Sequence, residues 1–148
     1  EPAVRPRVPA VAFVSLLLED FADEWLWRPA MHYRWSYPGS ARLMRAWLAE
    51  HAAEVPGPAF LKRAWWYLRQ RLFFVRLDGV TAATRAATEA AFLDTLDALE
   101  AIFRSRPFVL GERPSEADFG FFASMFRHFL CDPVSGRIVR GRAPAVQE

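Results

Sequence analysis

The sequence is poor in cysteine and in lysine. Cys131 is its single cysteine, so the chain can form no internal disulfide, which is compatible with a reducing compartment and leads us to expect the cytoplasm. Lys62 is its single lysine, and the formal net charge is only +2. A nucleic-acid-binding domain needs a broader basic footprint than this, so we expect no nucleic acid as a partner.

Long hydrophobic runs are also lacking. The most apolar early stretch, residues 11–18, is too short to span a bilayer and is followed at once by the acidic residues Glu19, Asp20, Asp23 and Glu24. No signal peptide is visible. We therefore expect no membrane segment, and we interpret the acidic residues as a solvated helix face because no histidine lies nearby in the sequence to complete a metal site.

Aromatic and other apolar side chains are abundant: apolar residues make up 53% of the chain, which includes six Trp and thirteen Phe. Their spacing is helical, and no strand-like alternation is sustained. The pattern predicts an all-α fold, a bundle of five to six helices. The expected helices span about 9–35, 40–55, 59–77, 81–104 and 115–130.

Several local features of these helices can be anticipated. We expect a kink at Pro29, which would clash with the preceding turn, and helix caps at Ser40 and Thr81. The helix over 59–77 should bury a stripe of apolar side chains, and the helix over 115–130, apolar on nearly every face, should be surrounded by other helices. The predicted stripe consists of Leu61, Trp65, Leu68, Leu72 and Val75.

The start of the last of these helices carries the most specific motif. Ser115 and Asp118 have the spacing of a capping box, in which each side chain satisfies the other residue's backbone N–H. Together with the preceding residues this segment, PFVLGERPSEADF over 107–119, closely resembles the segment that opens the inner helix of the C-terminal domain of glutathione S-transferases. The first predicted helix, residues 9–36, is similar to that of some bacterial members of this family.

The resemblance implies a domain organisation and a chemistry. We expect a linker at 1–8 and a C-terminal-type helical domain over 9–148, truncated at its C-terminus, with extra helices inserted at about 40–77. In the family, glutathione binds a thioredoxin-like N-terminal domain that also supplies the catalytic residue. The resemblance therefore implies no catalytic residue, metal or cofactor in this chain, and glutathione as a cosubstrate bound outside it.

Candidate site residues follow from the expected helix break. The family's hydrophobic substrate site draws on the first helix, which makes Trp27, Met31 and Tyr33 candidates for a pocket wall, although ordinary core packing is the alternative for each. The Ser115 and Asp118 roles are structural. His128 and Cys131 lie three apart, but two ligands do not complete a metal site, and we expect a hydrogen-bonded histidine and a buried thiol.

Two functions remain open at this point. The first is the helical domain of a transferase that conjugates glutathione to a hydrophobic electrophile, with the thioredoxin-like domain and a second copy as partners. The second is a non-catalytic interaction module, for which the helices inserted at about 40–77 would build a partner surface.

Overall fold

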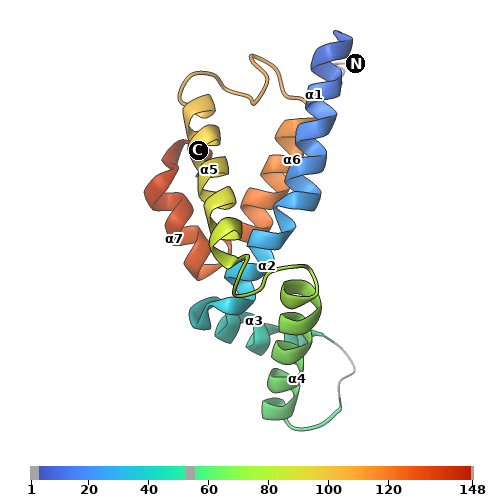
Figure 1. The fold of residues 1–148 in the computed structure, drawn as a ribbon, viewed down its shortest axis with the longest axis vertical. Helices are drawn as coiled ribbons and strands as arrows, with labels where there is room; N and C mark the ends of the chain where they lie inside the picture. The colour runs from blue at the N-terminus through green and yellow to red at the C-terminus, as the bar shows by residue number, and fades with distance from the viewer. Residues whose placement is uncertain (1–3, 53–55, 148) are drawn as a thin grey trace.

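The computed structural model describes residues 4–52 and 56–147, whose regular structure is helical (Figure 1). Among them, the one pairing of β type is an isolated bridge between Phe108 and Gly111. The α-helices are α1 (Pro9–Asp20), α2 (Trp27–Ser36), α3 (Pro38–His51), α4 (Ala59–Arg71), α5 (Arg85–Phe103), α6 (Glu116–Ser124), α7 (Pro133–Arg142) and α8 (Pro144–Gln147). Three π-helical segments are η1 (Phe21–Trp25), η2 (Leu72–Arg76) and η3 (Met125–Leu130).

Figure 1 shows an elongated arrangement in which α1, α5, α6 and α7 form the upper part and α3 and α4 form the lower part. Helix α2 lies between the two parts and packs against both, since it contacts α3, α5 and α7. The all-α fold expected from the sequence is confirmed. No described helix has the combination of length and apolarity that crossing a membrane requires.

The first long helix breaks one turn before Pro29 rather than at it. The backbone N–H of Leu26 donates to the carbonyl of Phe21 over 3.2 Å, five residues back, so the chain widens into η1. Pro29 then falls in the first turn of α2, where a missing N–H costs little. The predicted kink thus takes the form of a π-helical segment that lets the proline begin a new helix.

The expected caps at Ser40 and Thr81 are wrong. Helix α3 begins two residues earlier, with Pro38 in its first turn, and the buried Ser40 hydroxyl accepts instead from the backbone N–H of Val134, over 3.4 Å. Thr84 occupies the N-cap position of α5, and its hydroxyl accepts from the Thr81 backbone N–H over 2.9 Å. Hydroxyl residues close to a helix start have several local partners, so their position alone does not identify the cap.

Helix α4 turns its predicted buried stripe outward, so that prediction is also wrong except at Val75. Leu68 is 65% exposed, and Leu61, Trp65 and Leu72 are exposed as well. The helix packs mainly on α3 and, to a lesser extent, on α2. Contact on one side leaves Trp66 and Tyr67 half-buried, while the opposite apolar face has no cover among the described residues.

The helix that begins at Ser115 is covered on one side only. Ala117, Phe121 and Ser124 are buried against neighbouring elements, whereas Phe122 is 66% exposed, so the expectation of a helix surrounded on all sides is wrong. Its contacts are with α1, η1 and η3. Gly120 permits a close approach of α6 to α1, because a Cβ there would lie 3.1 Å from the Cα of Glu19.

The core lies where α2, α5 and η3 meet. Phe92 and Phe129 are fully buried and stack with their ring centroids 4.2 Å apart. Tyr33 packs on Phe92 at 5.2 Å, and Leu96 is fully buried beside them. This aromatic cluster fixes the inner face of α2, whose other residues reach the sites described next.

Candidate functional site

The three predicted pocket residues lie along α2 and face the interior. Met31 and Tyr33 are each 3% exposed and belong to the core. Trp27 is half-buried, with its ring edge-on to Phe74 and to His128, at 5.9 and 5.5 Å between centroids. None of the three lines either cavity described below, and their role in a substrate pocket remains a prediction.

An apolar cavity of about 300 Å³ opens beside the break between α1 and α2. Its walls come from η1, the first turn of α2, the turn before α5 and the first two turns of α5. Trp25 is its largest side chain and is 61% exposed, with the Arg28 guanidinium 5.0 Å from the ring centroid. The lining comprises Phe21, Trp25, Leu26, Arg28, Pro29, Asp78, Gly79, Thr84, Ala87, Thr88 and Ala91.

The sequence predicts a pocket near this break, but with Trp27, Met31 and Tyr33 as the candidate residues of its wall. Phe21 and Trp25 are four apart, a spacing that would place both on one face of a regular α-helix. The π-helical turn holds more residues than an α-helical turn, so it changes which side chains share a helix face. Trp25 consequently faces outward over the cavity. One sequence feature could have indicated the outward position of Trp25. It is a tryptophan one turn before a proline, where the regular helical register ends.

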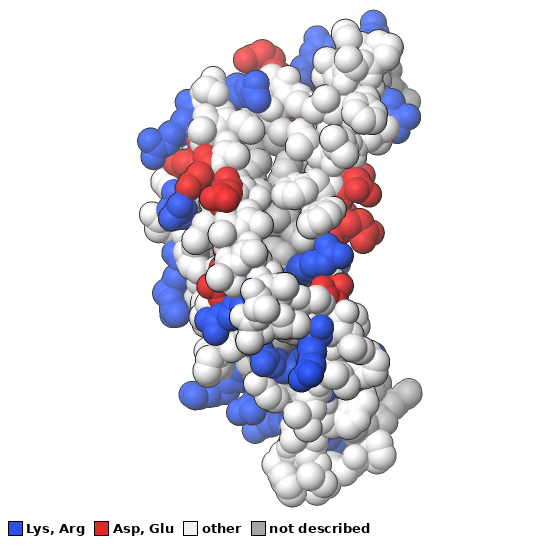
Figure 2. Space-filling model, in the orientation of Figure 1, with Lys and Arg blue, Asp and Glu red and all other residues white. Residues whose placement is uncertain are grey.

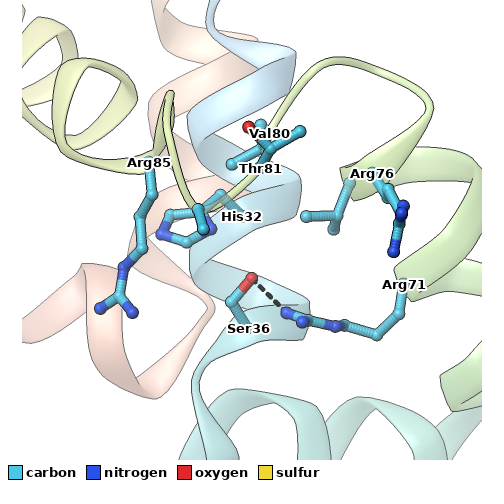
Figure 3. Close-up of a pocket in the computed structure, with 9 residues that line it drawn as sticks. His32, Ser36, Arg71, Arg76, Val80, Thr81 and Arg85 are labelled. Atoms are coloured by element: carbon cyan, nitrogen blue, oxygen red, sulfur yellow. Dashed lines mark hydrogen bonds between the residues drawn. The ribbon is translucent and has the colours of Figure 1, made fainter.

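A second, polar cavity of about 540 Å³ lies between α2, η2 and the start of α5 (Figure 3). Figure 3 shows Arg71 and Arg76 on one side of it and Arg85 on the other, with His32 and Ser36 of α2 between them. The lining comprises His32, Ser36, Arg71, Val75, Arg76, Val80, Thr81, Ala82 and Arg85. Three arginines and no acidic side chain are in this lining.

His32 is held in the wall of the polar cavity by Glu89. The imidazole Nε2 lies 2.8 Å from the Glu89 carboxylate, which also accepts from the Tyr37 hydroxyl over 2.7 Å and from Arg85 Nε over 3.0 Å. Burial alone would raise the pKa of Glu89, but the hydrogen bonds from His32, Tyr37 and Arg85 outweigh it and lower that pKa to about 2. Glu89 is therefore ionised at neutral pH and accepts from His32 Nε2–H.

This arrangement leaves the other ring nitrogen of His32 without a partner. The side chain is 2% exposed, and Nδ1 is buried with no hydrogen bond to the part of the chain that the structure describes. Burial lowers the pKa of His32 against the opposing effect of Glu89, with smaller lowering contributions from Arg85 and Arg71. In the neutral ring with Nε2 protonated, Nδ1 is a hydrogen-bond acceptor, and an unsatisfied buried acceptor costs about 1–3 kcal/mol.

The arginines differ in how they are held. Arg71 donates to the Ser36 hydroxyl over 2.6 Å, and Arg85 is paired with Glu89. Arg76 is exposed, and neither Arg71 nor Arg76 forms an ion pair with a described carboxylate. On the face shown in Figure 2, the charged side chains visible in the lower part, around α3 and α4, are basic. The cavity is thus lined by positive charge.

The capping box at the start of α6 is formed. The Asp118 carboxylate accepts from the Ser115 backbone N–H over 2.8 Å and from the Ser115 hydroxyl over 2.8 Å. It also accepts from the backbone N–H of Val109 over 2.7 Å, which ties the preceding loop to the helix start. Both side chains act on the fold and reach neither the polar cavity nor the cavity at the helix break.

His128 and Cys131 do not form a site together. His128 is half-buried beside Arg34, 3.5 Å from its guanidinium, and burial, aided by the charges of Arg34 and Arg127, lowers the pKa of His128 to about 4. Cys131 is exposed, so the expectation of a buried thiol is wrong: it follows the last turn of η3 and falls outside the packed face. Within residues 4–52 and 56–147, no three His, Cys, Asp or Glu side chains gather in a way that could hold a metal ion.

The architecture is an all-helical domain in which a capping box opens α6. Residues 82–147, from the turn before α5 to α8, match the family model described as Glutathione S-transferase, C-terminal domain. Over this segment, which is less than half of the chain, the sequence is similar to that domain family. No curated protein and no solved structure matches the chain.

Proposed function

We propose that this chain is the helical domain of a glutathione transferase-like enzyme and forms the wall of its hydrophobic substrate pocket. The family match over residues 82–147 carries this proposal. The thioredoxin-like domain that binds glutathione and supplies the catalytic residue lies outside the chain. In the reaction, that domain lowers the pKa of the glutathione thiol, and the thiolate attacks an electrophilic carbon.

The apolar cavity at the helix break is the part of this chain best suited to the electrophile. Trp25 and Phe21 offer aromatic surface, and the small side chains of Ala87 and Ala91 on α5 leave room for a flat ring. A cavity of about 300 Å³ accommodates a small aromatic molecule and lies at the lower end of the usual range for ligand pockets.

Exposed apolar faces supply surfaces for the other domain and for a second copy. On α1, Phe13 is 67% exposed and Leu17 is 54% exposed; on α6 and η3, Phe119, Phe122 and Phe126 are each more than half exposed. Apolar patches of this kind mark interaction surfaces. We propose that the thioredoxin-like domain and a dimer partner cover them, in a cytoplasmic protein.

Calorimetric titration of reduced glutathione into the full-length protein tests the proposal. Saturable binding is expected, together with thiol conjugation to electrophilic aromatic substrates above the uncatalysed rate. In the same protein, Trp25→Ala should raise KM for the aromatic substrate several-fold while glutathione affinity stays within about twofold, because Trp25 contacts only the electrophile. Trp47→Ala, an exposed tryptophan on α3, is the matched control. A folded protein that binds no glutathione contradicts the proposal.

A second candidate is favoured by the outward face of α4. Its apolar stripe of Leu61, Trp65 and Leu68, continued by Leu72 at the start of η2, is exposed, and arginines flank it. This combination suits a partner helix with an apolar stripe and acidic edges. If the folded full-length protein binds no glutathione, the interaction module becomes the better description. Leu68→Glu should then weaken binding of an acidic, leucine-striped helical peptide, whereas Phe126→Glu should not.

A further inference from the structure

The polar cavity is lined by side chains that donate hydrogen bonds. The guanidinium groups of Arg71, Arg76 and Arg85 and the hydroxyl groups of Ser36 and Thr81 lie in its wall, and no described carboxylate joins them. The cavity shares no lining residue with the apolar cavity at the helix break, so the proposed transferase function leaves it without a role. A wall of donors selects a ligand that is rich in acceptor oxygens.

Two of the three arginines bring uncompensated positive charge to this cavity. Arg85 is paired with Glu89 at 3.0 Å, and the carboxylate offsets its charge. No ion pair among the described residues includes Arg71 or Arg76. Asp78, the acidic residue closest to Arg76 along the chain, lines the other cavity. A phosphate monoester, with about two negative charges at neutral pH, balances this pair of arginines better than a single carboxylate does.

Arg71 and Ser36 form a preorganised donor pair in the wall. The Nη1 of Arg71, the last residue of α4, donates to the Ser36 hydroxyl over 2.6 Å (Figure 3). The Ser36 oxygen acts as the acceptor in this bond, so its own proton is free to be donated to a ligand. Arg76, at the end of η2, lies on the same side of the cavity as Arg71. Three donor groups thus match the three terminal oxygens of a phosphate monoester.

The rest of the wall offers the ligand little apolar surface. Val75 is 3% exposed and Val80 is 6% exposed. His32 has no free nitrogen to offer, because Nε2 is bonded to Glu89 and Nδ1 is closed off from solvent. A hydrocarbon body would therefore bury little surface here, whereas a hydroxylated body keeps its contact with water. The volume of about 540 Å³ is typical of small-molecule sites and leaves room for such a body beside the phosphate group.

We infer that the polar cavity binds a small hydrophilic phosphate ester. Arg71 and Arg76 hold the phosphate oxygens, and the Ser36 hydroxyl donates to the same group. Arg85, held by Glu89, forms the opposite side of the site. The inference rests on the geometry of this chain and does not depend on whether glutathione binds elsewhere.

Glucose 6-phosphate is a suitable probe, because it joins a phosphate monoester to a hydroxylated ring. Two analogues separate the effects of charge: glucuronate carries a single carboxylate on a similar ring, and glucose carries no charge. Calorimetry on the chain should show saturable binding of glucose 6-phosphate, roughly tenfold or more weaker binding of glucuronate, and no measurable binding of glucose, in keeping with the loss of charge-assisted hydrogen bonds.

Variants and side-chain spectra localise the binding. Arg76→Ala should weaken binding of glucose 6-phosphate at least about fivefold, since it removes one charged donor group. Arg42→Ala, which removes an exposed arginine of α3 from the same basic part of the molecule, should change it by less than about twofold. In NMR spectra of the unmutated protein, the Nε–H signals of Arg71 and Arg76 should shift at saturation, and that of Arg42 should not.

Four results overturn the inference. They are an absence of saturable binding of glucose 6-phosphate to the folded protein, equal binding of glucuronate, equal weakening by Arg42→Ala, and Nε–H signals of Arg71 and Arg76 that do not move at saturation. Inorganic phosphate that binds as tightly as the ester would overturn the assignment to an ester. Displacement of glucose 6-phosphate by an equal concentration of reduced glutathione would assign the cavity to glutathione instead. The NMR measurement needs no substitution, so it decides the question even if a variant fails to fold.

Discussion

Replacement of Asp118 by alanine should destabilise the domain more than loss of an ordinary helix cap. The carboxylate accepts two hydrogen bonds from Ser115 and a third from the backbone N–H of Val109, a residue that is 1% exposed. Loss of a cap costs about 0.5–2 kcal/mol, and a buried N–H left without a partner adds about 1–3 kcal/mol. We expect a total loss of about 2–4 kcal/mol in the free energy of unfolding.

Urea unfolding followed by circular dichroism measures this loss directly. In a thermal scan, the same loss corresponds to a fall in Tm of roughly 6–12 °C for a domain of this size. Glu112→Ala is the matched control, because Glu112 is an exposed carboxylate of the same loop and should change stability by less than about 0.5 kcal/mol. An Asp118→Ala variant that unfolds within about 0.5 kcal/mol of the parent, with an unchanged m value, would refute this reasoning.

Three further predictions concern packing, protonation and the chain end. Gly120→Ala should cost about 1–3 kcal/mol because its Cβ would meet the backbone of α1 at 3.1 Å, whereas Gly141→Ala, with open space around it, should be neutral or stabilising in urea unfolding. The pKa of His128 is lowered from 6.5 to about 4, so between these pH values the unfolded chain binds a proton that the folded chain does not. Stability should therefore fall as pH drops through this interval, and His128→Gln should flatten that slope in pH-dependent unfolding. Glu100 accepts from the backbone N–H of Ala145 at the start of α8, over 2.8 Å, so Glu100→Ala should speed amide hydrogen exchange in residues 145–147 and leave exchange in α6 unchanged.

The sequence was sufficient to predict the features that depend on local chemistry. The capping motif at Ser115 correctly predicted the N-cap residue of α6, and Pro29 correctly indicated a break in the first helix. Helical spacing correctly indicated helices in every segment where it was strong. These features depend on hydrogen bonds and sterics within a few residues, which a sequence displays directly.

Predictions of burial succeeded less often, because periodicity shows which residues share a face but not whether another element covers that face. Leu61 and Leu68 share a face of α4 that is open, and Phe122 belongs to the open side of α6. Coverage depends on contacts between distant segments and on parts of the protein outside the described residues. An amphipathic pattern therefore marks a contact surface without distinguishing an internal contact from an external one.

The candidate sites were harder to anticipate for a related reason. His32 in the wall of the polar cavity pairs with Glu89, 57 positions later, and lies near arginines of α4, η2 and α5, and no short motif connects these residues. The cavity at the helix break depends on the π-helical turn, which rotates Trp25 away from the register that the sequence suggested. Both sites are products of tertiary packing and altered helical register, which single-sequence patterns do not encode.

The exposed position of Cys131 has a practical consequence for spectroscopy. Because it is the only cysteine in the sequence and lies at the junction of η3 and α7, a maleimide dye or nitroxide attaches at one known point of the native chain without any substitution. The nearby Trp27–His128 contact supplies an intrinsic fluorophore one turn away. The chain holds six tryptophans, so energy transfer to such a dye gives a summed signal, which changes when this end of the bundle moves as a ligand or a partner domain docks.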